Sequence, residues 1–185
     1  MFYILTSSAD TYITNKILQN KFRATDSNVG RAGTLDLFKL YDESSFIDSG
    51  TRVTSSVGEI SRILLKFDYS NLVPLTSESL DINSTTFKAV LRLSEVNSGT
   101  PVPTNFNVVG YPLAIAFDEG SGRSTSQFSD VDAANFVTAS YSSGSPTLWN
   151  ITGSEKSGYL GDSSIDYITS GSVGGTEIDF GSSQY

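Results

Sequence analysis

Two stretches of the chain alternate apolar and polar residues strictly, the pattern that lets a β-strand bury one face. In residues 62–68, Ile63, Leu65 and Phe67 share one face. In residues 87–93, the matching face carries Phe87, Ala89, Leu91 and Leu93. Because successive side chains point to opposite sides of a strand, the pattern predicts two central strands that pair with each other and turn these faces to the core.

Shorter runs rich in β-branched and aromatic residues predict further strands at 10–14, 35–41, 106–113 and 147–151. Glycine, asparagine and proline predict turns at 28–33, 98–103 and 118–123. Residues 13–22 also fit a helical stripe, but helix caps are missing, which favours a strand followed by a loop. Residues 42–58 are polar and predict a long exposed loop. The best helix candidate is 130–136, because Ser129 or Asp130 could cap it.

These elements predict an all-β protein: a jelly-roll-like antiparallel β-sandwich with long loops and at most one or two short helices. The length of 185 residues suits a single domain spanning 1–185. From residue 153 onward glycine and serine dominate, so we interpret 154–185 as loop-like, with isolated apolar anchors such as Ile165, Tyr167 and Ile178 for short strands.

Charge and composition then narrow the classes of function. The net charge of −8 predicts repulsion from phosphate backbones and anionic lipid, so neither nucleic acid nor membrane is an expected partner. The chain has no cysteine and no histidine, which argues against Ser-His-Asp and Cys-His catalysis and against the usual zinc sites. The carboxylates show no pair in a recognisable catalytic setting, so no enzyme activity is predicted.

Clustered acidic residues could supply oxygen ligands to calcium at Asp118-Glu119, Asp130-x-Asp132 and Asp162 to Asp166. None has the spacing of a calcium-binding loop. Turn and cap roles account for these aspartates, so no cofactor is predicted, although a structural calcium stays open.

Aromatic side chains could stack on sugar rings, and the candidates for a glycan site are Trp149, Tyr141 and Tyr111. Trp149 lies between the apolar Leu148 and Ile151, which favours a place in the core.

The order of several short motifs resembles that of DNRLRE-type domains. The motifs are Asp10-x-Tyr12-Ile13, Asn28-Val29-Gly30, Leu35-x-Leu37, Ser61-Arg62-x-Leu64-Leu65-Lys66-Phe67-Asp68, Ala89-x-Leu91-x-Leu93, Phe117-Asp118-Glu119-Gly120, Ala134-Asn135-Phe136 and Leu148-Trp149-Asn150-x-Thr152-Gly153. Phenylalanine stands at 117 and 136 where the family more often has tryptophan, and the string that names the family is absent. The resemblance implies a jelly-roll β-sandwich of surface and extracellular proteins, in which Asp10 and Gly30 set turns and Leu65 and Phe67 face the core.

The version found in structural proteins of tailed phages, especially marine myophages, is the most similar in detail. That family domain continues beyond the point reached at Tyr185, so the resemblance implies that these residues are the N-terminal part of a longer chain. Residues 1–6 lack the basic and long apolar regions of a secretory signal, which fits a phage particle.

The expected function is therefore structural: assembly of a tailed-phage virion in its tail, neck, baseplate or capsid decoration. The expected partners are other virion proteins and copies of this chain, contacted through loops at 42–58 and 121–127 or through an open sheet edge. The expected location is the virion. The alternative is a carbohydrate-binding module of a secreted or surface protein, with a glycan as partner.

Overall fold

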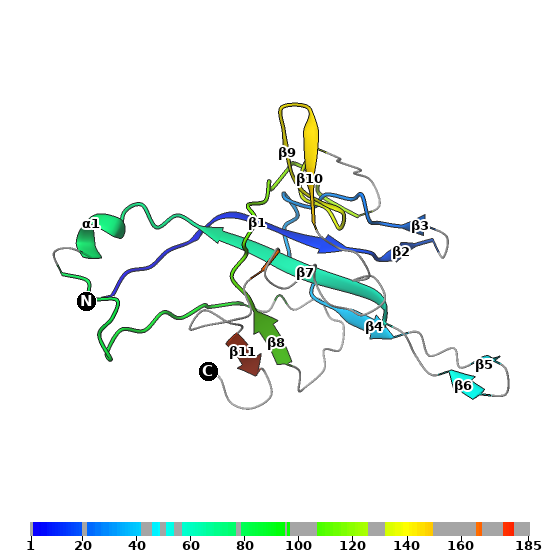
Figure 1. The fold of residues 1–185 in the computed structure, drawn as a ribbon, viewed down its shortest axis with the longest axis horizontal. Helices are drawn as coiled ribbons and strands as arrows, with labels where there is room; N and C mark the ends of the chain where they lie inside the picture. Colours follow the sequence, from blue (N-terminus) through cyan, green and yellow to red (C-terminus); the bar gives the residue numbers. More distant parts are fainter. Residues whose placement is uncertain are drawn as a thin grey trace.

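The computed structural model describes residues 2–19, 22–41, 46–48, 51–53, 57–76, 79–94, 96, 107–125, 132–149, 166–167 and 176–179. Within these ranges the chain forms mostly strands and one short helix, as the sequence predicts for an all-β protein (Figure 1). The elements are β1 Ser7–Thr14, β2 Ile17–Leu18, β3 Phe22–Arg23, β4 Lys39–Tyr41, β5 Phe46–Asp48, β6 Thr51–Val53, β7 Val57–Phe67, α1 Val73–Thr76, β8 Asn107–Gly110, β9 Thr138–Ser142, β10 Ser145–Leu148 and β11 Thr176–Asp179.

The main sheet is antiparallel and has the strand order β1-β7-β4. The strand β7 is its 11-residue centre. Along β1 the register places Tyr12 opposite Ile63 and Thr14 opposite Ser61, with an irregularity between Ser7 and Ala9. The remaining described strands form antiparallel pairs: β2 with β3, β5 with β6, β8 with β11, and β9 with β10.

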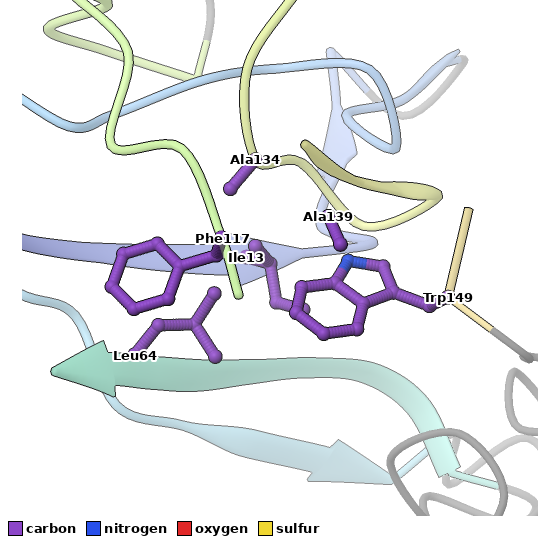
Figure 2. Packing of buried hydrophobic residues seen from close by; sticks show 6 residues of the cluster. All are labelled: Ile13, Leu64, Phe117, Ala134, Ala139 and Trp149. Atoms are coloured by element: carbon purple, nitrogen blue, oxygen red, sulfur yellow. The ribbon is translucent and has the colours of Figure 1, made fainter. Parts of the chain in front are cut away.

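The hydrophobic core lies against the β1–β7 pair (Figure 2). Its cluster of buried residues is Ile13, Leu64, Phe117, Ala134, Ala139 and Trp149. The predicted orientation of β7 is therefore wrong: Leu64 is the buried side chain, whereas Leu65 and Phe67 are only half-buried. The reason is tertiary, because the segments that contribute Phe117 and Ala134 cover the face of β7 that carries Leu64.

The second predicted central strand is also wrong. Residues 87–94 form no strand, and their apolar side chains are exposed: Phe87 at 41%, Val90 at 76% and Leu91 at 47%. The strands that pair with β7 are β1 and β4. An alternating pattern indicates that a segment can form a strand, but it does not indicate which strand will pair with that segment.

Two further predictions fail where the structure describes them. The predicted loop 42–58 contains the β5–β6 pair and the start of β7. No helix forms over 132–136; there the Asn135 side chain accepts hydrogen bonds from the N–H groups of Val137 and Thr138, which competes with helical bonding. The helix that does form, α1, lies where none was expected.

The hairpin of β9 and β10 was predicted only in its second strand. Its turn residues Ser143 and Gly144 both have positive φ, 53° and 82°, which matches the twist that a two-residue hairpin turn needs.

The predicted strands 35–41 and 106–113 are shorter than expected: β4 covers only Lys39–Tyr41 and β8 only Asn107–Gly110. The turn at 98–103 and most of 154–185 lie outside the described residues. Among the described residues, no helix is long and apolar enough to cross a membrane.

Candidate functional site

Asn28 is fully buried, and its side-chain amide joins three separate segments of the chain. Its Nδ2 donates to the carbonyl oxygens of Glu119 and Ala134, each at 2.8 Å. Its Oδ1 accepts from the backbone N–H groups of Gly122 at 2.8 Å and Gly30 at 3.2 Å. An amide has two donor hydrogens and two acceptor lone pairs, so all four are used. We call these five residues the Asn28 junction.

Glycines allow the segments of the Asn28 junction to approach this closely. A Cβ on Gly30 would overlap the carbonyl oxygen of Glu119, and a Cβ on Gly122 would overlap the carbonyl oxygen of Asn28. Any other residue at either position would push the two backbones apart. The turn at 28–33 and the turn at 118–123, which the sequence predicted separately, are thus one packed unit.

Two neighbouring carboxylates tie the Asn28 junction to the strands. The backbone N–H of Asp10 on β1 donates to Glu119 Oε1 at 2.9 Å. The backbone N–H of Tyr141 on β9 donates to Asp118 Oδ2 at 2.9 Å. Hydrogen bonds of a carboxylate to backbone N–H groups are stronger than neutral ones, so these contacts hold β1 and β9 around the junction.

Asn135 and Trp149 close the other side of the core. The indole Nε1–H of Trp149 donates to the carbonyl oxygen of Asn135 at 3.0 Å, and only 4% of Trp149 is exposed. The motifs at 10–13, 28–30, 117–120, 134–136 and 149 therefore meet in space. Their polar groups satisfy one another, which is the chemistry of a structural junction rather than of an open ligand site.

The glycan candidates do not share one exposed surface. The ring of Trp149 packs with Ile13 and Leu64 in the core, so its faces are closed to a sugar (Figure 2). Tyr111 is 44% exposed, and its ring centre lies 4.9 Å from that of Tyr167 with the two rings tilted by 52°, while Tyr141 is half-buried on β9. Among the described residues, no group of three carboxylates gathers to hold a metal ion; Asp130 and Asp162 lie outside them.

The burial of Trp149 predicts its fluorescence. We expect native emission at short wavelength and little quenching by iodide, because only 4% of Trp149 is exposed and the side chain belongs to the hydrophobic core. Unfolding in urea should shift the emission to the red and restore quenching. Trp149 is the only tryptophan, so the signal is unambiguous. Native emission that iodide quenches as efficiently as in urea would contradict this placement.

Two groups of the main sheet have displaced pKa values: the buried Tyr12 and the half-buried Arg62. Burial, the charge of Asp36 and a 3.3 Å hydrogen bond to it raise the pKa of Tyr12 from 10.0 to about 12. Burial lowers the pKa of Arg62 from 12.5 to about 10. The guanidinium of Arg62 lies 5.2 Å from the centre of the Phe136 ring, and its Nη2 has no partner among the described residues. Burial thus disfavours the charged form of both groups.

The raised pKa of Tyr12 predicts a pH effect on stability. The folded state keeps the phenolic proton up to about pH 12, while the unfolded state releases it near pH 10. The contribution of Tyr12 is therefore complete below pH 10 and is lost as pH rises to about 12. Arg62 has the opposite effect on stability between pH 10 and 12, because the folded state loses the Arg62 proton at a lower pH than the unfolded state does.

The comparison of wild type with Tyr12→Phe isolates this effect. We expect the stability difference between the two proteins to shrink between pH 10 and 12 in urea titrations. In absorbance titrations, the variant should lack one phenolate that the wild type forms near pH 12. If the phenolate that the variant lacks forms near pH 10 in the wild type, the raised pKa of Tyr12 is contradicted.

Most of the exposed large apolar side chains of the described residues belong to residues 2–4 and 69–96, outside the Asn28 junction. We call this set the apolar flank: Phe2, Tyr3, Ile4, Tyr69, Val73, Ile82, Phe87, Val90, Leu91, Leu93 and Val96. Along the long axis of the molecule, the N-terminal segment, α1 and residues 79–86 lie at the same end (Figure 1). Val90, Leu91 and Leu93 are exposed close together on one extended segment, and clustered exposed apolar side chains are typical of interaction sites.

The sequence does not reveal the apolar flank, because an alternating pattern predicts that the apolar face is buried. The one available signal was the polar, turn-rich segment 68–86, which separates the two alternating stretches by a long connection. Comparisons with protein-family models, curated proteins and solved structures found no match to this chain.

Proposed function

We propose that this protein is a structural component that works by assembly, through contacts of its apolar flank with other protein chains. The observation that carries the proposal is the exposure of Phe87, Val90 and Leu91 on an extended segment. Burying such side chains removes apolar area from water at about 25 cal/mol per Å², which is the main driving force of protein association. The Asn28 junction would supply the rigid base that such a component needs.

The setting that we propose is the particle of a tailed phage. Its support is the resemblance of the motifs at 10–13, 28–30, 61–68 and 117–120 to the phage version of the DNRLRE-type domain. The same resemblance supports a jelly-roll arrangement of the sheets. The net charge of −8 favours protein partners over nucleic acid or anionic membranes. A carbohydrate-binding role would have to use Tyr111 or Tyr141 without the indole of Trp149.

Assembly is tested by sedimentation of the full chain over a wide concentration range. We expect the wild type to self-associate or to bind particle proteins, and Val90→Asp to weaken that association. The matched control is Leu148→Asp, which places the same charge at a 54% exposed apolar position outside the apolar flank. Mass spectrometry of particles purified from the source should detect the chain. A protein that stays monomeric and is absent from particles would overturn the proposal.

A further inference from the structure

Among the described residues, one edge of the central strand β7 has no neighbouring strand over about half of its length. On this side β4 pairs with β7 only from Val57 to Ile60, and the N–H of Ser61 donates to the carbonyl oxygen of Phe38. Backbone groups alternate in direction along a strand, so those of Ile63, Leu65 and Phe67 face the same side as those of Ser61. No described strand lies beside them there. Within the part of the chain that the structure describes, these groups have no hydrogen-bond partner on that side, so they form a row of donors and acceptors that a further strand could pair with.

A second segment of the same chain has the sequence of a strand but pairs with no described strand. Residues 88–94 are extended, and none of their backbone groups makes a hydrogen bond to another described residue. Their alternating sequence is that of a strand, yet Val90 is 76% exposed and Leu93 43%. Figure 1 shows this segment running apart from β7. The described part of the chain thus has a strand-like segment that belongs to no sheet and a stretch of sheet edge that has no neighbouring strand.

We propose that residues 87–94 of a second copy of this chain add as a strand to the open edge of β7. The inference rests on the proposed function and names its partner. Within one chain, residues 68–86 lead away from β7 and are held by local backbone bonds from Leu72 to Tyr69, from Leu80 to Leu75 and from Phe87 to Ser84. Each copy offers one donor strand and one acceptor edge, so two copies can exchange strands about a two-fold axis.

More than one antiparallel register of β7 with residues 87–94 keeps the apolar side chains of both strands on a common face. Charge argues against the first of these registers. That register places Lys66 opposite Lys88 and Arg62 opposite Arg92. Like charges directly opposite each other destabilise a strand pair.

A shift by two residues removes this conflict. It places Asp68 opposite Lys88 and Lys66 opposite Val90, and the apolar sets still share a face. Asp68 and Lys88 carry opposite charges and attract each other, and the aliphatic stem of Lys66 covers the exposed Val90. The second register is therefore the one that we infer.

Engineered disulfides test the partner and the register together, because the chain has no cysteine of its own. Lys66→Cys and Val90→Cys alter exposed side chains, so both variants should fold. In the inferred register their Cβ atoms lie roughly 4.5–5.5 Å apart across the strand pair. We expect covalent dimers when the two single variants are mixed under mild oxidation.

The matched control is Lys66→Cys mixed with Lys88→Cys. In the inferred register these positions are diagonal, about 7–8 Å apart, and should give little disulfide. A preference for the control pair would overturn the register. A disulfide that forms only within one chain carrying both Lys66→Cys and Val90→Cys would overturn the exchange between copies.

Sedimentation of the wild type distinguishes failure of this inference from failure of the proposed function. Self-association without any disulfide between Lys66→Cys and Val90→Cys would overturn the strand exchange and leave the assembly function standing. No self-association and no disulfide would overturn the exchange, and the absence of the chain from purified particles would then overturn the assembly function as well.

Discussion

Asn28→Ala is expected to lower the free energy of unfolding by about 3–5 kcal/mol. The substitution leaves two backbone N–H groups and two carbonyl oxygens of the Asn28 junction without their side-chain partner. Each buried unsatisfied group costs about 1–3 kcal/mol, and the four costs do not simply add, because the loops can shift and admit water. Urea denaturation followed by the fluorescence of Trp149 measures the loss.

The control for this prediction is Asn83→Ala, at an exposed asparagine whose side chain makes no hydrogen bond to another described residue. Its expected effect is within about 0.5 kcal/mol. Equal stability of the Asn28→Ala and Asn83→Ala proteins would show that the Asn28 junction does not hold the fold.

Asn28→Asp tests the donor half of the Asn28 junction separately. At neutral pH the new carboxylate would set a charged oxygen against the carbonyl oxygens of Glu119 and Ala134, so we expect a loss at least as large as that of Asn28→Ala. Acid should restore part of the stability, because a protonated carboxyl can donate one hydrogen bond. A variant insensitive to pH would argue that these two carbonyl contacts are unimportant.

Gly30→Ala is expected to destabilise the protein by about 3 kcal/mol or more, or to prevent folding. The new Cβ would occupy the position of the Glu119 carbonyl oxygen and would also crowd the Glu119 side chain. The obstacle is backbone, so relief requires the two turns of the Asn28 junction to separate. The measurement is again urea denaturation, with soluble yield as the readout if the variant does not fold.

Gly33→Ala is the matched control, three residues away in the same turn. A Cβ on Gly33 would meet nothing within 4 Å, so the expected change is within about 0.5 kcal/mol. If both substitutions cost the same, the penalty at Gly30 would come from chain entropy and not from the close approach of Glu119. The pair therefore separates a steric cause from a conformational one.

Local features of the fold could be predicted from the sequence because their physical cause lies within a few residues. The patterns in 10–14 and 62–68 predicted the strands that became β1 and β7. The neighbours of Trp149 predicted its burial, and the glycines at 30 and 120 predicted turns. For the Asn28 junction the sequence supplied each part separately, and nothing in the local pattern indicated that Asn28 and Glu119 would meet.

By itself, the sequence determined the all-β class, the two long strands of the main sheet, their turns and the core position of Trp149, because backbone propensity and side-chain period act locally. Only the tertiary structure decided that Leu64 rather than Leu65 is buried, that β1 and β4 flank β7, and that residues 87–94 stay exposed. These outcomes depend on which distant segments cover each face. A period of two distinguishes the faces of a strand but does not state which face meets the core.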